Sequence, residues 1–397
     1  MRIADRIRRL GTETAFAVGA EATAFAARGK RVFPFHLGDL NIPVPECIVE
    51  ATLKALRDGK TGYCPNAGIP ILREAIAADV SATHGTTYGP ENVVVQPGGK
   101  PTIGKFLAAV MNPGDEVLYP NPGYPIYESQ IEYLGGVAVP YGYVETPTNF
   151  DLDFAAIERG LTARTKMLIL NDLQNPSGAE LSPEQRRQLA KLVRDHDLYV
   201  LCDEAYFDIR YSGRSTSFIE EEGMKERTVL LYTFSKRFAM TGWRLGASVG
   251  PKEVVDVIAK INVNDESCSN HFIQYGAVAG LEHAQADVAR MLETLRARRD
   301  VLAAGLNAID GVRCVVPNAT FYLFPNVTEV MTRKGLDDYE AFRRAALEAI
   351  GVSFTTRLHF GRVQPGETER YIRFAYSGID VADIEEALGR FQTWCEA

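Results

Sequence analysis

The chain has 397 residues, 46% hydrophobic and 24% charged, which is the balance of a globular protein long enough for two domains. Its formal net charge of -8 argues against nucleic acid as the main partner, because duplex binding relies on an excess of Lys and Arg. No apolar run reaches the length of about 18 residues that a membrane-spanning helix needs, so we expect no membrane partner.

The N-terminal segment, MRIADRIRRLGTETAF, is basic but has no compact apolar stretch, so we expect no secretory signal. The six cysteines are scattered and form no C-x-x-C pair, which is typical of reduced thiols in a cytoplasmic enzyme. The histidines show no H-E-x-x-H or similar spacing, so we expect no metal site.

Between about residues 92 and 250, short apolar runs alternate with helical patterns. The β-branched run NVVVQ leads through the glycine turn of PGGK into a helix, and the strand DEVLYP precedes a helix over YPIYESQIEYLGG. The continuous apolar run TKMLILND is typical of a buried parallel strand. This alternation predicts a mostly parallel sheet with helices on both faces.

The helix that follows has a clear beginning. SPEQRRQLAKLVRDHD opens with Ser182, Pro183 and Gln185, which form a capping box with proline at the first helical position. After this helix, LYVLCDEAY and TVLLYTFSK predict two more strands of the same sheet.

The C-terminal third has a different pattern. A long helical region extends from about Ser269 to about Ile309, with a break near Glu282. Short strands and helices follow, among them VSFTTRLHF, RYIRFAYSG and DVADIEEALGRFQ. We therefore expect a large α/β domain of residues 46–285 and a smaller α+β domain of residues 1–45 and 286–397.

Polar residues follow the predicted strands at their carboxyl ends, where sites form in open parallel sheets. Taken singly, Asn175 fits a turn, Asp203 a helix cap or an ion pair, and Lys236 a solvated surface. PGGK lacks the spacing of a P-loop, and it fits either a tight turn or a phosphate site at a helix start. Together, these groups at one sheet edge indicate a single site.

Several spaced motifs resemble those of the class I/II aminotransferases, which are fold-type I enzymes that use pyridoxal 5'-phosphate (PLP). SKRFAMTGWRLG is similar to the family's cofactor-lysine segment, NDLQNPSG to its N-x-x-N-N-P-T-G loop, and CDEAY to its D-E-x-Y strand end. GYCPNAGIPILREAIA and RYIRFAYS match two further segments. The resemblance covers essentially the whole chain. It implies a seven-stranded, mostly parallel sheet, a smaller α+β domain that closes over the substrate, and a homodimer.

The resemblance also implies how the cofactor ring is held. Lys236 would form a Schiff base with the cofactor aldehyde, and Asp203 would keep the pyridine nitrogen protonated. Asn175 and Tyr206 would hydrogen-bond the phenolic oxygen, and Tyr124 would stack on the ring. Lys236, Asp203 and Tyr206 are thus the expected catalytic residues.

By the same resemblance, Arg244, Ser235 and the backbone amides near Gly99 and Lys100 would hold the cofactor phosphate. Tyr63 would reach that phosphate from the partner subunit of a homodimer.

On the substrate side, the resemblance implies that Arg373 binds the substrate α-carboxylate through two parallel hydrogen bonds, with Asn175 beside it. It places Gly38 at the position where the family closes on the substrate. Lys100 stands where aspartate-type members of one subgroup carry a lysine that meets a distal carboxylate, although it could equally contact only phosphate or solvent. HLGDLNIPVP and PNATFYLFP depart from the family pattern on this side and leave the amino-acid preference open.

The expected function is therefore transfer of an amino group from an L-amino acid to a 2-keto acid, with an acidic substrate as one option. A PLP-dependent β-lyase acting on C–S bonds would share the cofactor residues and is the main alternative. A PLP-binding regulator with a helix-turn-helix module finds no room in the chain. A Rossmann enzyme would need G-x-G-x-x-G after the first strand, which is absent.

Overall fold

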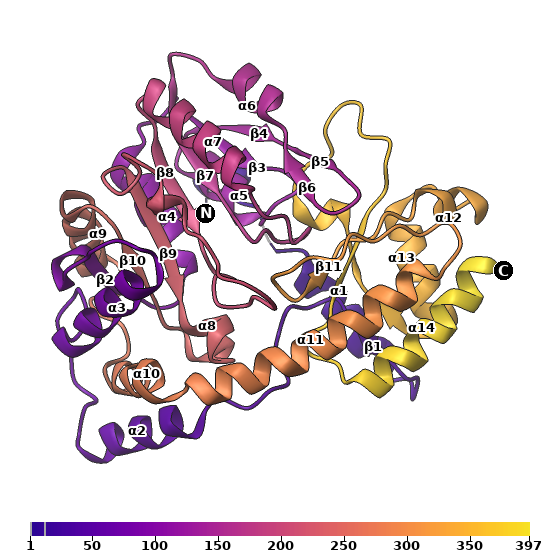
Figure 1. The fold of residues 1–397 in the computed structure, drawn as a ribbon, viewed down its shortest axis with the longest axis horizontal. Helices are drawn as coiled ribbons and strands as arrows, with labels where there is room; N and C mark the ends of the chain where they lie inside the picture. The colour runs from indigo at the N-terminus through magenta and orange to yellow at the C-terminus, as the bar shows by residue number, and fades with distance from the viewer. Residues whose placement is uncertain (1, 12) are drawn as a thin grey trace.

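The computed structural model describes residues 2–11 and 13–397, and a seven-stranded sheet lies at its centre (Figure 1). The strand order is β2-β10-β9-β8-β7-β3-β4. β10 is antiparallel to both of its neighbours, whereas the other adjacent strands are parallel. These strands are β2 (Val93–Gln96), β3 (Glu116–Pro120), β4 (Val137–Tyr141), β7 (Thr165–Leu170), β8 (Tyr199–Asp203), β9 (Thr228–Thr233) and β10 (Gly246–Val249). The predicted mostly parallel, seven-stranded sheet is confirmed.

Helices cover both faces of this sheet, as the alternating pattern predicts. α7 begins with the predicted capping box, because the Ser182 hydroxyl accepts the Gln185 N–H at 3.1 Å and Gln185 Oε1 accepts the Ser182 N–H at 3.0 Å. The helices of this part are α2 (Glu46–Arg57), α3 (Pro70–Thr83), α4 (Lys100–Val110), α5 (Ile126–Tyr133), α6 (Phe154–Gly160), α7 (Pro183–Asp195), α8 (Phe234–Arg237), α9 (Lys252–Asn264) and α10 (His271–His283). Short 3-10 turns η2 (Pro90–Asn92), η3 (Phe218–Glu220) and η4 (Thr241–Trp243) and a hairpin of β5 (Tyr143–Glu145) and β6 (Phe150–Leu152) complete it.

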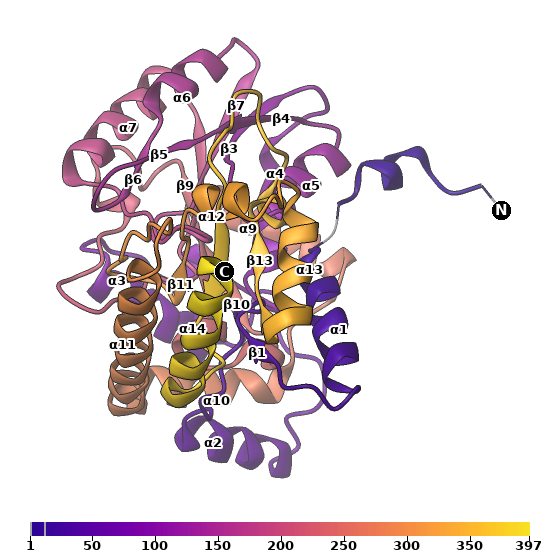
Figure 2. The same cartoon turned by 90° about the vertical axis from the view of Figure 1, so that its right-hand side faces the viewer.

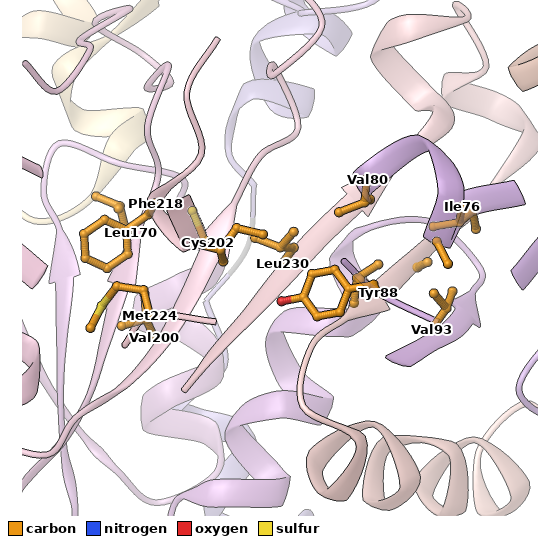
Figure 3. Close-up of a cluster of buried hydrophobic side chains, with 14 of the residues drawn as sticks. Ile76, Val80, Tyr88, Val93, Leu170, Val200, Cys202, Phe218, Met224 and Leu230 are labelled. Carbon is orange, nitrogen blue, oxygen red and sulfur yellow. The ribbon is translucent and has the colours of Figure 1, made fainter. Parts of the chain in front are cut away.

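Burial on both faces explains the continuous apolar strands. In β7, Leu168 and Leu170 belong to one buried cluster, whereas Met167 and Ile169 between them belong to a cluster on the opposite face. Because side chains alternate between the two faces of a strand, both sets need an apolar partner layer. Figure 3 shows part of the first cluster, in which side chains of the central strands meet Phe218 and Met224.

The C-terminal third builds a second, smaller layer with its own core. A three-stranded sheet has the order β11-β14-β13, and β1 pairs in parallel with β12, so that Phe33 near the N-terminus lies opposite Val352. Its elements are η1 (Asp5–Arg9), α1 (Ala15–Ala26), β1 (Phe33–Pro34), α11 (Gln285–Asn307), β11 (Tyr322–Leu323), α12 (Thr328–Arg333), α13 (Tyr339–Ile350), β12 (Val352–Ser353), β13 (Thr355–Thr356), η5 (Arg357–Phe360), β14 (Ile372–Ala375) and α14 (Val381–Glu396).

The long helical region predicted near residues 269–309 consists of α10 and α11, which are separated at Ala284, close to the predicted break. In Figure 1, α11 runs from the left-hand part that holds the large sheet to the right-hand part that holds α13 and α14. Figure 2 shows the N-terminal end projecting from the body beside α5. We propose that the separate cores mark two domains, residues 46–285 and residues 1–45 with 286–397.

No helix in the described part of the chain combines the length and apolar character needed to cross a membrane. Within residues 2–11 and 13–397, no group of three or more His, Cys, Asp or Glu side chains is arranged to hold a metal ion.

Candidate active site

A cavity of about 640 Å³ lies at the carboxyl ends of the parallel strands, between the large sheet and the smaller layer. It brings together side chains and backbone from both parts of the molecule. The predicted site residues that line it are Gly38, Gly99, Lys100, Tyr124, Asn175, Asp203, Tyr206, Ser235, Lys236, Arg244 and Arg373. Tyr63 does not line it and is 88% exposed on the surface of the chain.

Lys236 lies on the short helix α8, directly after β9. Its Nζ donates a hydrogen bond to the Gly38 carbonyl oxygen at 2.9 Å. The pKa of Lys236 is lowered to about 8, mainly because the amine is removed from bulk water. The charges of Arg373 and Arg244 act in the same direction, whereas those of Asp39 and Glu13 oppose the shift. A neutral, nucleophilic amine is therefore accessible near neutral pH.

Asp203 ends β8 and is almost fully buried, with 5% of its surface exposed. Its Oδ2 accepts the Tyr127 hydroxyl at 2.5 Å, and its Oδ1 accepts the Ala205 N–H at 3.1 Å. Burial raises the pKa of Asp203 to about 6, although these hydrogen bonds and the charge of Lys236 counteract the shift. Such a carboxylate stabilises a positive charge brought into the cavity beside it.

The start of α4 forms a cradle with Arg244. Gly98 has a φ of 101°, and a Cβ at this position would lie 2.1 Å from Arg244 Nη2. A Cβ at Gly99 would lie 2.5 Å from Leu231 Cδ2. Gly98 thus lets the Arg244 guanidinium lie against the backbone where α4 begins, and Gly99 lets this backbone pack closely on Leu231 of β9. The Ser235 hydroxyl lines the same cavity. Unpaired helix N–H groups, a cation and a hydroxyl are the chemistry that binds a phosphate.

Arg373 lies on β14 and is 4% exposed. Its Nη1 donates to Asn175 Oδ1 at 2.9 Å and its Nη2 to the His36 carbonyl oxygen at 3.0 Å. The guanidinium lies 4.3 Å from the centre of the Tyr322 ring and 4.7 Å from that of Phe360. Its Nε has no hydrogen-bond partner, and no described carboxylate forms an ion pair with it. A buried, fixed guanidinium of this kind is ready to take an anion.

The tyrosines close the cavity around these groups. The hydroxyls of Tyr206 and Tyr322 lie 2.7 Å apart, and burial raises the pKa of the Tyr206 hydroxyl well above its ordinary value. The ring of Tyr124 meets that of Tyr127 edge to face, with centres 5.7 Å apart. A Cβ at Gly38 would lie 2.2 Å from the Tyr322 hydroxyl, so a side chain at that position would displace this tyrosine.

Three residues of the site escaped the sequence reasoning. Tyr127 supports Asp203, and Asn171 ties the loop to the strand, because its Nδ2 donates to the Asp203 carbonyl oxygen and its Oδ1 accepts the Asn175 N–H. Asn171 is the first asparagine of NDLQNPSG, so the motif itself carried the signal. Tyr322 falls in PNATFYLFP, the segment expected on the substrate side, but no sequence feature distinguished it from its aromatic neighbours.

The site therefore combines a lysine of lowered pKa, a buried carboxylate and a phosphate cradle at the strand ends of an α/β sheet. These features define a fold-type I enzyme that binds PLP. The family of class I and II aminotransferases has a sequence model that matches residues 30–391.

Curated relatives agree with this result over nearly the whole chain. The chain is 31% identical over 378 residues to an aspartate aminotransferase of Musicola paradisiaca, with 95% of this chain and 92% of that protein covered. It is 33% identical over 394 residues to an aspartate/prephenate aminotransferase of Thermus thermophilus, with 98% and 97% covered.

Solved structures share the fold closely. An aspartate aminotransferase from Thermus thermophilus with maleate has a TM-score of 0.89 at 30% identity, covering 99% of this chain and 100% of that one. The aspartate aminotransferase from Rhizobium meliloti has a TM-score of 0.91 at 30% identity, covering 100% and 99%.

The chain belongs to the class I and II aminotransferase family. It is a PLP-dependent transaminase that moves an amino group from an L-amino acid to a 2-keto acid. The comparisons do not favour the alternative of a C–S β-lyase.

Proposed function

We propose that the preferred substrates carry a second acidic group on their side chain. The supporting observation is that two cations, Arg373 and Lys100, line the same cavity as Lys236. Arg373 would take the α-carboxylate and Lys100 a distal carboxylate. The relatives named aspartate aminotransferases, and the neighbour solved with maleate, support the same class of substrate.

PLP, when bound, supplies an electron sink for the substrate α-carbon. We propose that Asp203 holds the proton on its ring nitrogen, that Asn175 and Tyr206 face its phenolic oxygen, and that Tyr124 lies against its ring. The buried position of Asp203 and the Tyr127 hydroxyl at 2.5 Å support this role, because they fix a carboxylate that gains most when a cation approaches it.

The phosphate would be held by Arg244, Ser235 and the N–H groups near Gly99 and Lys100. The close approach of Arg244 to the backbone of Gly98 at the start of α4 supports this assignment, since an added Cβ there would displace the guanidinium.

Lys236 would anchor the cofactor and then move the α-proton of the substrate. Its lowered pKa, about 8, supports a role as a base, because a larger fraction of the amine is neutral near neutral pH than for an ordinary lysine. Gly38 accepts a hydrogen bond from this amine and lies on the segment that joins the smaller layer, so closure of that layer would reposition the amine.

We also propose a homodimer in which Tyr63 completes the partner's phosphate site. The nearly full exposure of Tyr63 on one chain supports this arrangement, since a large aromatic side chain at 88% exposure gains from burial at an interface. The free state of all six cysteines supports the predicted cytoplasmic location.

Hybrid dimers test the role of Tyr63. We expect Tyr63→Phe to bind PLP more weakly and Lys236→Ala to be inactive. A hybrid of the two variants would have one intact site, built from the Lys236 of one subunit and the Tyr63 of the other. We expect the hybrid to regain about half of the wild-type activity. A hybrid with only half the activity of the Tyr63→Phe dimer would contradict an intersubunit role.

Substitution of Lys100 tests the substrate class. We expect Lys100→Gln to lower kcat/KM for aspartate or glutamate about tenfold, the lower end for loss of a hydrogen bond between charged groups, since the side chain is 44% exposed. Transfer from alanine should change less than twofold. An equal loss for all three amino acids would refute recognition of a distal carboxylate. Assays for pyruvate and ammonia would detect β-lyase activity.

A further inference from the structure

Glu13 is a carboxylate at the active-site cavity that the proposed function does not use. It precedes α1 in the chain and lines the cavity together with Ala15 and Phe16. Its Oε2 accepts a hydrogen bond from Lys100 Nζ at 2.8 Å, and its side chain is 20% exposed. The amine that would meet a distal carboxylate therefore already has an anionic partner.

The charge of Glu13 reaches the centre of the site. Burial, and after it the charge and hydrogen bond of Glu13, raise the pKa of the Tyr124 hydroxyl well above its ordinary value. Lys100 Nζ also lies 5.6 Å from the centre of the Tyr124 ring. Glu13, Lys100 and Tyr124 thus form one wall of the cavity.

The other carboxylates of the cavity are engaged elsewhere. Asp203 accepts from Tyr127, and Asp39 accepts the Thr241 hydroxyl at 2.6 Å. Among the carboxylates of the cavity, Glu13 is therefore the one that contacts Lys100.

The pair presents a hydrogen-bond donor and an acceptor side by side. A distal carboxylate accepts from Lys100 but brings a second negative charge beside Glu13, which is unfavourable. A primary carboxamide has no charge, and its oxygen accepts from the amine while its N–H group donates to the carboxylate. The donor and acceptor of the pair match those of the carboxamide one for one.

We propose that Glu13 is a specificity-determining residue, which with Lys100 forms a distal subsite for a side-chain carboxamide as well as for a carboxylate. Amino acids of the asparagine and glutamine type are then amino donors alongside the dicarboxylic ones. This inference rests on the proposed function, in which Arg373 binds the α-carboxylate and Lys100 faces the substrate side chain.

Succinate and succinamate test the subsite directly, because they are unreactive and differ only in a carboxylate against a carboxamide. Their dissociation constants are measured by calorimetry on the PLP-loaded enzyme, for the wild type, Glu13→Gln, Lys100→Gln and Asp5→Asn. The last variant removes a carboxylate from the same N-terminal segment that is exposed and does not line the cavity. Matched kcat/KM values for asparagine and aspartate, and for glutamine and glutamate, provide the second readout.

We expect Glu13→Gln to change the ratio of the succinate and succinamate affinities at least tenfold in favour of succinate. The ratios of kcat/KM for aspartate over asparagine and for glutamate over glutamine should rise as well. Asp5→Asn should leave both ratios within twofold. If Lys100→Gln weakens succinate but Glu13→Gln leaves the ratio unchanged, the distal lysine stands and the inference about Glu13 is wrong. If Lys100→Gln leaves succinate unaffected, the proposed acidic specificity fails, and the carboxamide subsite fails with it.

Discussion

Burial of Asp203 makes the active site costly for the stability of the apoprotein. The pKa of Asp203 rises from 3.8 to about 6 in the folded chain, mainly because burial disfavours the charged form. A difference of about two pH units corresponds to about 3 kcal/mol of unfolding free energy at neutral pH. We therefore predict that Asp203→Asn stabilises the apoprotein by up to about 3 kcal/mol at pH 8, although it removes the charge that the cofactor ring needs.

The sign of the pH dependence follows from the protonation of the two states. Well below pH 3.8 the Asp203 carboxyl is neutral in both the folded and the unfolded chain, so its burial carries no cost of removing a charge from water. As pH rises toward 6, the unfolded chain ionises first, so the free energy of unfolding of the wild type declines until the folded group also ionises. The advantage of Asp203→Asn should therefore shrink to about 1 kcal/mol at pH 4.5.

Urea unfolding of the two apoproteins at pH 8 and pH 4.5 measures this effect. The amide keeps the local hydrogen bonds in place, because its oxygen can accept the Ala205 N–H and its NH₂ group can donate to the Tyr127 hydroxyl. A variant that is less stable than the wild type at pH 8, or an advantage that is equal at both pH values, would refute the reasoning.

The other predictions concern single groups of the site. Because Arg373 is buried and hydrogen-bonded, Arg373→Gln should cost about 2–5 kcal/mol of transition-state binding, which lowers kcat/KM for every amino acid about 30- to 4,000-fold. The absorbance of the bound cofactor should show that PLP still binds. An unchanged apparent affinity for amino acids would remove Arg373 from the site. Capture of PLP by the apoprotein requires a neutral Lys236, so its rate should rise with pH and reach half its maximum near pH 8; a midpoint near 10.5 would contradict the lowered pKa. Gly99→Ala should weaken PLP binding about tenfold in a fluorescence titration, because its Cβ would meet Leu231 at 2.5 Å. Gly389→Ala, where a Cβ has open space, is the control. Equal PLP affinities of the two variants would count against the proposed phosphate site.

The apolar strands of the central sheet could be predicted from the sequence, whereas two strands of that sheet, β4 and β10, could not. β7 stands out as six residues of which the last four are fully buried. β10 has four residues, Gly246 to Val249, and no long apolar run marks them. It is recognisable as a strand only through its register with β2 and β9. β4 lacks a continuous apolar run as well, because it is exposed or half-buried over most of its length.

The site followed a similar rule. Residues within recognisable segments, such as Asp203 and Lys236, could be found, because the chemistry lies at the ends of strands. Supporting contacts between distant segments could not. Tyr127 meets Asp203 across 76 positions of sequence, and Glu13 meets Lys100 across 87. Such pairs depend on how α5 and the N-terminal segment pack, and no local pattern encodes that packing.

The reversed direction of β10 has a consequence for how the enzyme can change. Gly246 lies opposite Thr233, so both ends of the connection from β9 to β10 are fixed by sheet register. Lys236 and Arg244 are both carried by this one connection, in which Ala239 and Arg244 adopt left-handed backbone conformations. One inserted residue would move the amine and the guanidinium relative to each other, and neither strand could slip to absorb it. Variation in this segment is therefore restricted to exchange of side chains.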